Sequence, residues 1–340
     1  MIKRQRVTIK EVARQAGVST QTISRVLNRH PDVAPETRQR VLRLIEELDY
    51  HPSALARSLI QRRSAMLGVV TAGLQFIGPS QTLKGIIEQA ESMGYALLLK
   101  ELPRFDTPHI ETVFQALLSR QVDGILWAVP EIGSNRDWIP QEIDTLSVPV
   151  VFLDTRPRPG ITSISIDNAG GARLATQHLL ERGCRRIAHI SGPLEWWSAC
   201  ERLRGWQEAL AEAGLPAPQK AVASGNWSSG SGEGAMHTLL DQYPDMDAVF
   251  VANDQMALGA AHAARERGRQ VPRDLRMVGF DDIPESAFFL PPLTTVDQDL
   301  IAMGRTAVQE LVAVIEHEPQ AEPATKSIRL QPALKVREST

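Results

Sequence analysis

Residues 7–28 read VTIKEVARQAGVSTQTISRVLN, and this stretch decides the fold of the N-terminal part of the chain. Thr8, with Glu11 three residues later, fits the capping box that begins a helix. Gly17 is expected to end that helix, because glycine tolerates the left-handed conformation of a C-cap. Ser19 can then cap a second helix. The stretch therefore predicts two short helices joined by a tight turn.

A third helix is predicted to begin at Pro35, because proline suits the first helical position. Two short helices with a glycine turn and a supporting third helix make a helix-turn-helix unit, whose second helix enters the major groove of DNA by its N-terminal end. There Gln21 can pair with adenine and Arg25 with guanine, and Thr20 can contact a thymine methyl group or a phosphate. Each residue alone is better explained as a solvated surface position. Their occurrence together favours DNA contact.

The charge of the chain also differs between the N-terminal part and the rest. Residues 1–63 hold thirteen Lys and Arg against six Asp and Glu, a net charge of +7. The remaining residues hold 24 basic and 34 acidic side chains, a net charge of −10, so the whole chain carries −3. A basic head on an acidic body indicates that only the head meets a polyanion.

Length and composition exclude several classes of protein. A chain of 340 residues suggests two or three domains, and 43% hydrophobic with 23% charged residues is ordinary for a folded protein. No run of eighteen apolar residues predicts a transmembrane helix, and no apolar segment near the N-terminus predicts a secretory signal. Cys184 and Cys200 are expected to be reduced thiols in a cytoplasmic protein. We expect no cofactor, no metal ion and no membrane contact.

From residue 64 onward, short apolar runs alternate with amphipathic helices, which predicts parallel sheets covered on both faces. The runs lie at 66–70, 95–99, 124–129, 148–153, 187–190, 248–251 and 277–280, with helices near 80–93, 109–120, 170–182, 199–213, 231–240, 254–267 and 299–317. Ligands bind beyond the carboxyl ends of such strands. Asp154, Asn253 and Asp281 follow three of the runs, and their carboxylate and amide groups suit polyol hydroxyls, which donate and accept hydrogen bonds. Asp254 also follows a run, but a helix cap explains it as well.

The stretch 7–28 closely resembles the head of the LacI/GalR family of transcription regulators, and residues 49–59, DYHPSALARSL, resemble that family's hinge helix. The resemblance implies that the hinge helix folds in the minor groove and that Leu59 wedges into a base step, while Ala56 lets two hinge helices meet closely. An apolar wedge that unstacks a step bends the duplex and gains contacts elsewhere. We therefore expect DNA contacts from Thr8, Ser19, Thr20, Gln21, Thr22, Ser24, Arg25, Asn28, Ser53, Ala56 and Leu59.

The resemblance extends over the body, for example in VANDQMALGA at 251–260 and PPLTT at 291–295, and is strongest to the lactose-responsive branch of the family. It implies a palindromic operator, a sugar effector of the galactoside type and a homodimer. No leucine-heptad tail follows, so a dimer rather than a tetramer is expected. It also implies a pocket that binds the effector through Phe76, Pro79, Ser80, Asp154, Trp196, Ser198, Arg202, Trp227, Asn253, Asp281 and Gln298. Arg202 has a reason of its own, because a guanidinium fork can hold two neighbouring hydroxyls.

The sequence departs from the lactose-responsive pattern in three places. Ala128 replaces an asparagine that contacts sugar, and Leu300 replaces an aromatic wall residue. Glu195, Trp196 and Trp197 stand where that pattern has small residues. The two tryptophans either add a stacking platform for a larger or β-linked sugar or pack as lid or core. The purine-binding branch has an arginine at the position of Trp196, which disfavours a purine effector. These departures leave the identity of the sugar open.

The predicted architecture is an all-α helix-turn-helix head, residues 1–50, a hinge, residues 51–63, and an α/β body of two doubly wound parallel-sheet lobes, residues 64–340, like a periplasmic binding protein. One lobe is expected over about 64–165 and 293–325, and the other over about 166–292 and 326–340. The expected function is a transcriptional repressor of a sugar operon, released from DNA when the sugar changes the lobe arrangement. An activator remains the alternative. A periplasmic solute-binding protein would need a signal peptide and no DNA-binding head, and no spaced catalytic set predicts an enzyme.

Overall fold

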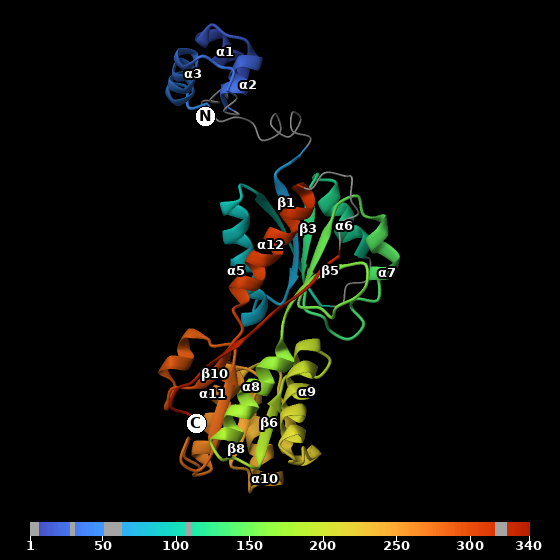
Figure 1. Ribbon diagram of the computed structural model, residues 1–340, viewed down its shortest axis with the longest axis vertical. Helices are drawn as coiled ribbons and strands as arrows, with labels where there is room; N and C mark the ends of the chain where they lie inside the picture. The colour runs from blue at the N-terminus through green and yellow to red at the C-terminus, as the bar shows by residue number, and fades with distance from the viewer. Residues whose placement is uncertain (1–6, 28–30, 51–62, 106–109, 317–324) are drawn as a thin grey trace. The chain divides into compact units, whose positions relative to one another are not determined.

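The computed structural model describes residues 7–27, 31–50, 63–105, 110–316 and 325–340. The chain divides into two compact units, Met1–Ser64 and Ala65–Thr340, which we call the head and the body (Figure 1). Four predicted DNA contacts, Asn28, Ser53, Ala56 and Leu59, lie outside the described residues. Within the described part of the chain, no helix is both long and apolar enough to cross a membrane.

The head is the predicted unit of three helices, α1 (Ile9–Ala16), α2 (Thr20–Leu27) and α3 (Pro35–Glu47). The hydroxyl of Thr8 accepts a hydrogen bond from the backbone N–H of Glu11, and the hydroxyl of Ser19 accepts one from Thr22, so both predicted N-caps are formed. Gly17 ends α1 with φ 65°, which glycine adopts without strain. The helices enclose a small apolar core of Val12, Ala13, Ala16, Ile23, Val26, Val33, Val41 and Tyr50.

The body contains two six-stranded sheets, which define its N-lobe and C-lobe. The N-lobe sheet has the order β11-β5-β4-β3-β1-β2, and all its strands are parallel. Its strands are β1 (Met66–Ala72), β2 (Ala96–Leu102), β3 (Gly124–Ala128), β4 (Val150–Leu153), β5 (Thr162–Ile166) and β11 (Ser327–Leu330). Helices α5 (Ile77–Ser92) and α12 (Leu300–Glu316) cover one face, and α6 (Ile110–Leu118) and α7 (Ile139–Glu142) lie on the other (Figure 1).

The C-lobe sheet has the order β12-β10-β9-β8-β6-β7, in which only β12 is antiparallel to its neighbour. Its strands are β6 (Ile187–Ser191), β7 (Val222–Ser224), β8 (Ala248–Val251), β9 (Arg276–Phe280), β10 (Thr294–Asp297) and β12 (Ala333–Lys335). Helices α8 (Asn168–Glu181) and α9 (Trp197–Glu212) cover one face, and α10 (Ser229–Gln242) and α11 (Asp254–Glu266) cover the other. The predicted fold class is confirmed, because each parallel sheet is buried between two helical layers.

The predicted lobe boundaries near residues 293 and 326 were wrong. Strand β10 pairs with β9 in the C-lobe, so the chain returns to the N-lobe only after Asp297. Strand β11 pairs with β5 in the N-lobe, so the last crossing falls between Leu330 and Ala333. These strands are short and partly polar, and nothing local in their sequences indicates which sheet they join. Pairing with distant strands decides it.

Candidate functional site

The exposed face of α2 carries the residues expected to read DNA. Thr20, Gln21 and Arg25 are exposed at its surface, while Thr22 and Ser24 are half-buried. Gln21 and Arg25 are four residues apart and so lie on one face of the helix. Ile23 and Val26 point the opposite way into the head core. The fold of the head thus presents polar side chains on one side of a helix that its core holds in place.

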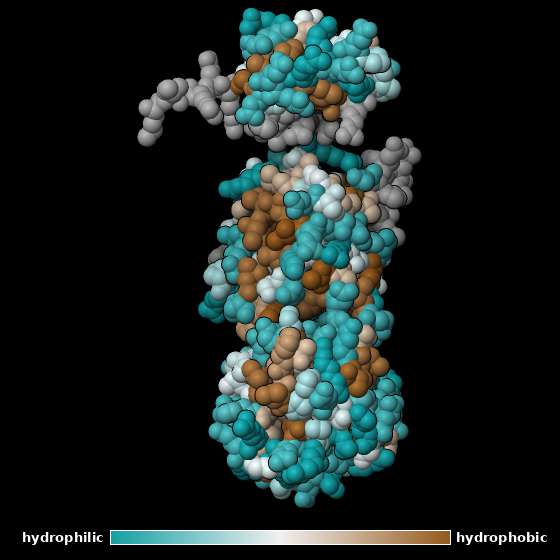
Figure 2. Space-filling model, turned by 90° about the vertical axis from the view of Figure 1, so that its left-hand side faces the viewer, coloured by the Kyte–Doolittle hydropathy of each residue, from teal (hydrophilic) through white to brown (hydrophobic). Residues whose placement is uncertain are grey.

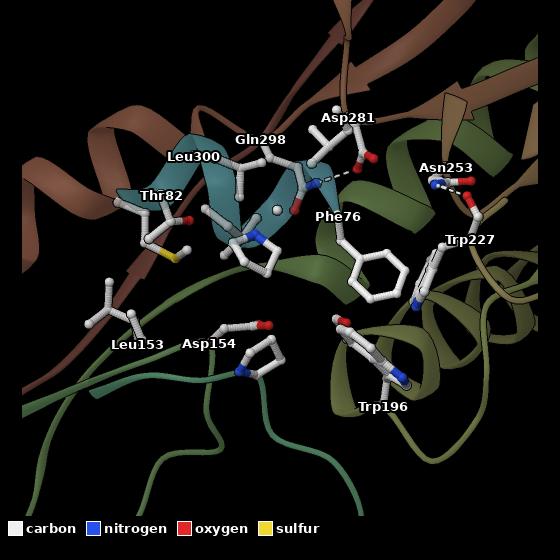
Figure 3. Close-up of a pocket in the computed structure, with 18 of the residues that line it drawn as sticks. Phe76, Thr82, Leu153, Asp154, Trp196, Trp227, Asn253, Asp281, Gln298 and Leu300 are labelled. Carbon is white, nitrogen blue, oxygen red and sulfur yellow. Dashed lines mark hydrogen bonds between the residues drawn. The ribbon is translucent and has the colours of Figure 1, made fainter. Parts of the chain in front are cut away.

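A cavity in the body is lined by both lobes, with an empty volume of about 720 Å³ that includes space open to solvent. Several of its polar residues follow the carboxyl ends of strands, as expected for doubly wound sheets. Asp154 follows β4, Asn253 follows β8 and Asp281 follows β9. Figure 3 shows Asp154 directed into the space opposite Asp281 and Gln298, with Phe76, Trp196 and Trp227 gathered on one side.

Arg202 of α9 is held in place by groups of the C-lobe. Its Nε donates to Oδ1 of Asn168 at 2.8 Å, Nη1 donates to the carbonyl of Ala252, and Nη2 donates to Oε1 of Gln298 at 3.1 Å. The guanidinium carbon also lies 3.9 Å from the centre of the Phe280 ring. A cation fixed by three hydrogen bonds and an aromatic face is oriented before a ligand arrives.

Asp281 lies against this arginine. Its Oδ1 accepts a hydrogen bond from Nε2 of Gln298 at 2.5 Å and is 3.6 Å from Nη1 of Arg202. Burial raises the pKa of Asp281 to about 7 although the charge of Arg202 opposes the rise, and the nearby Asp254 adds to it. Burial also raises the pKa of Asp154, against the charges of Arg202 and Arg136. With a pKa of about 7, the carboxyl group of Asp281 can both donate and accept hydrogen bonds near neutral pH.

Four aromatic side chains from the two lobes form the wall of the cavity and the region behind it. The ring of Trp196 lies 5.5 Å from Phe76, 5.0 Å from Phe105 and 5.7 Å from Trp227, each in an edge-to-face arrangement. Trp196 lines the cavity, whereas Trp197 is buried at the start of α9 and does not. The two tryptophans therefore differ in role. Trp196 is a pocket wall and Trp197 is core packing.

Three residues of the cavity have backbone conformations that side chains rarely adopt. Asp154, Trp227 and Asp281 have φ angles of 48°, 74° and 115°. Such conformations persist only where the surrounding structure holds them, and they gather at functional sites. The segments that follow β4, β7 and β9 therefore hold these three residues in unusual conformations in which they line the cavity.

The comparison with known proteins agrees with both parts of the chain. Residues 8–53 match the bacterial regulatory proteins of the lacI family, and residues 176–340 match the periplasmic binding protein-like domain. The chain is 34% identical to the lactose operon repressor of Escherichia coli (strain K12) over 334 residues, which is 98% of this chain and 90% of that protein. The chain belongs to the lacI family of bacterial regulatory proteins.

This lacI-family regulator is also 38% identical to the transcriptional regulator CelR of Thermobifida fusca over the full length of both proteins. The crystal structure of the lac repressor dimer bound to operator and an anti-inducer has a TM-score of 0.85 and 34% identity, covering 98% of this chain and 99% of that one. The complex of CelR with cellobiose has a TM-score of 0.71 and 35% identity, covering 98% and 100%. The relatives are regulators of transcription, and this chain is a DNA-binding regulator with a ligand-binding body rather than an enzyme.

The body of the regulator brings together all the predicted effector contacts except Ser80. The hydroxyl of Ser80 donates to the carbonyl of Ile77 within α5, and the residue does not line the cavity. Asn253 lines the cavity, but its side chain already makes two hydrogen bonds within the protein. Its Oδ1 accepts from the N–H of Met256, and its Nδ2 donates to the carbonyl of Trp227. The other predicted residues on the wall are Phe76, Pro79, Asp154, Trp196, Ser198, Arg202, Trp227, Asp281 and Gln298.

The sequence did not indicate several further wall residues of the regulator, namely Ile77, Gly78, Thr82, Pro130, Leu153, Ile166, Gln255 and Met303. Leu153 ends β4, so the strand-end rule that selected Asp154 would also have found it, whereas Ile166 ends β5, a strand that no apolar run predicted. Asp254 is buried and accepts hydrogen bonds from the hydroxyls of Ser286 and Thr295 and from the N–H of Ile283. It ties α11 to the loop after β9, and the helix cap is Asn253 instead.

Proposed function

We propose that this regulator is a repressor that binds a palindromic operator in the cytoplasm and is released from it by a small sugar. The observation that carries the proposal is the cavity between the lobes, where Arg202, Asp281 and Gln298 form a fixed hydrogen-bonding group opposite Asp154. Such a group can exchange hydrogen bonds with several hydroxyls at once. The exposed Gln21 and Arg25 on α2 support base reading by the head.

The aromatic wall supports a β-linked glycoside as the effector. The family resemblance implies a galactoside, and Trp227 offers an apolar face for the apolar face of a sugar ring. Trp196 and Phe76 extend this surface, and Ala128 leaves room where the lactose-responsive pattern has a larger polar residue. A solved complex of a CelR regulator with cellobiose, a β-linked disaccharide, is 35% identical to this chain. A β-glucoside of this kind is therefore the second candidate beside the galactoside.

The surface of the body supports a homodimer. Phe288 and Leu290, in the loop after β9, are 82% and 94% exposed, and Leu258 of α11 is also exposed. Ile87 of α5 and Leu99 of β2 are exposed on the N-lobe. Figure 2, which faces the side of the body that carries α5 in Figure 1, shows apolar side chains gathered on both lobes. Apolar patches of this kind mark interaction sites, and a second copy is the occupant that a palindromic operator requires.

The two lobe arrangements of such a dimer would couple the sugar to the DNA. The wall residues come from both lobes, so a sugar that prefers one arrangement shifts the population toward it. If the other arrangement binds the operator, linkage requires operator DNA to weaken sugar affinity by the same factor by which sugar weakens operator affinity.

The decisive experiment is fluorescence anisotropy of a labelled palindromic operator, titrated with the protein and then with β-galactosides, cellobiose, other β-glucosides and purines. Release by a β-glycoside is the expected result. Asp154→Ala should lose the response and keep operator binding, and loss of operator binding would instead make Asp154 structural. Tight DNA binding that no sugar relieves would remove the sugar from the proposal. Transcription that rises with operator occupancy would make the protein an activator.

A further inference from the structure

The C-lobe carries a second cluster of chemically active side chains on helices α10 and α11. Glu233 and His237 are four residues apart on α10, and His262 and Glu266 are four residues apart on α11, so each pair shares one helix face. The two helices pack along each other. One ligand atom from each of Glu233, His262 and Glu266 lies within 4.8 Å of the other two. None of these side chains lines the cavity between the lobes.

The separation of His262 and Glu266 suits two ligands of one metal ion better than a hydrogen-bonded pair. Nε2 of His262 is 3.4 Å from Oε1 of Glu266, and Nε2 of His237 is 3.5 Å from Oε2 of the same carboxylate. Hydrogen bonds between nitrogen and oxygen are commonly about 2.7–3.2 Å long. Two atoms that each lie about 2.0–2.1 Å from a tetrahedral zinc ion are about 3.3 Å apart.

The surroundings allow an ion to enter and be held. The side chains of His262 and Glu266 are 61% and 51% exposed, and Glu233 is half-buried. The cluster is therefore open to solvent on the side of His262 and Glu266. Helices α10 and α11 hold the ligand positions rigidly, which loops would not. Without an ion, the contacts of Glu266 with the two histidines would be surface ion pairs, and such pairs contribute little to stability.

We propose that Glu233, His262 and Glu266 bind a divalent transition-metal ion of the zinc class. Imidazole and carboxylate are both zinc ligands, and three protein ligands leave one position for water. Nε2 of His237 lies 3.5 Å from the second oxygen of Glu266, which places it beside the site as an outer-shell partner of that carboxylate. The ion would join α10 to α11 and stabilise the C-lobe. This site is independent of the sugar pocket and of the proposed regulation.

The test is calorimetric titration of the full-length, tag-free protein with zinc chloride after treatment with a chelator, with magnesium chloride as the control ion. We expect one zinc ion per chain, a higher melting temperature with zinc, and no binding of magnesium. His262→Gln and Glu266→Gln should each abolish the binding. His237→Gln should weaken it by about 10–100-fold, as the loss of an outer-shell partner does.

Two matched variants control the experiment. Glu181→Gln removes an exposed carboxylate from α8 of the same lobe, and His317→Gln removes a histidine from elsewhere in the sequence. Both should bind zinc as the unmodified protein does. Circular dichroism without metal should show that all variants are folded. Zinc binding that survives both His262→Gln and Glu266→Gln would overturn the proposal, and so would half an ion per chain, which would place the ion between two copies.

Discussion

Ile132 of the N-lobe and Trp196 of the C-lobe pair with each other as an isolated antiparallel β-bridge. Two backbone hydrogen bonds flank the pair, from Gly133 to the carbonyl of Glu195 at 2.9 Å and from Trp197 to the carbonyl of Glu131 at 3.0 Å. The side chain of Glu131 is buried and accepts two hydrogen bonds from Arg158, at 3.0 and 2.8 Å. A residue that lines the pocket thus also joins the lobes, and its partner loop is anchored by an ion pair.

This double role of Trp196 predicts that Trp196→Ala weakens both effector binding and the body itself. Removing a large buried side chain from the aromatic group should cost about 3–5 kcal/mol of unfolding free energy. Urea unfolding and sugar titration would measure the two effects. Trp196→Phe is the control, because it keeps the backbone bridge and part of the ring surface, and it should lose much less. Unchanged sugar affinity in Trp196→Ala would remove the residue from the binding wall.

Arg202→Lys should weaken sugar binding while the protein remains folded. Lysine keeps the charge near Asp281 but cannot donate to Asn168, Ala252 and Gln298 together or lie flat on Phe280. The loss of one hydrogen bond to a charged group corresponds to about 1.5–3 kcal/mol, or roughly 10–100-fold in affinity. Sugar titration and operator binding without sugar are the measurements. Normal sugar affinity in this variant would show that the guanidinium fork is not used.

Gly192→Ala tests the position of Trp227. A Cβ atom at residue 192 would overlap the ring of Trp227, which is close against the glycine. The ring must then move into or out of the pocket, so sugar affinity should fall although the change adds only one methyl group. Overpacking of this kind costs about 1–3 kcal/mol. Operator binding by the head should stay normal. Unaltered sugar affinity would show that the position of the Trp227 ring does not matter for binding.

Asp281 predicts a specific pH dependence of stability. Its pKa in the folded protein is raised from 3.8 to about 7. Its favourable contribution to the free energy of unfolding is therefore complete below pH 4 and is lost as the pH rises through 7. Asp281→Asn mimics the neutral acid. The variant should therefore gain stability relative to the unmodified protein between pH 4 and 7, with no further change above pH 8. Urea unfolding at several pH values measures this difference. The same pH dependence of the unfolding free energy in both proteins would contradict the prediction.

Arg25→Ala should relax the preference for one base pair of the operator at a cost of about 1–3 kcal/mol. The reason is that a bidentate contact to guanine distinguishes base pairs, whereas a phosphate contact does not. Binding to a set of operators that differ at each position would measure the effect. Equal loss of affinity for every base would make Arg25 a phosphate contact.

Three residues of the site followed from strand ends in the sequence, and most of the others followed from the family resemblance. Asp154, Asn253 and Asp281 each follow an apolar run, and parallel strands bring such residues to one edge. The role of Asn253 was only partly predictable, because its bond to Trp227 joins the ends of β8 and β7. Ser80 does not line the cavity, and its hydroxyl donates to the carbonyl of Ile77 in its own helix. Strands β5, β7, β10, β11 and β12 went unpredicted, since they are short and several alternate or end in polar residues.

The sequence by itself determined the head. Thr8, Gly17 and Ser19 act on backbone groups no more than about four residues away, so the signals for α1 and α2 are complete within twenty residues. The tertiary structure alone decided which lobe β10 and β11 join, that Trp196 lines the pocket while Trp197 does not, and that His262 meets Glu233. These depend on the order of strands and the packing of helices that are far apart in the chain, and no local pattern carries that information.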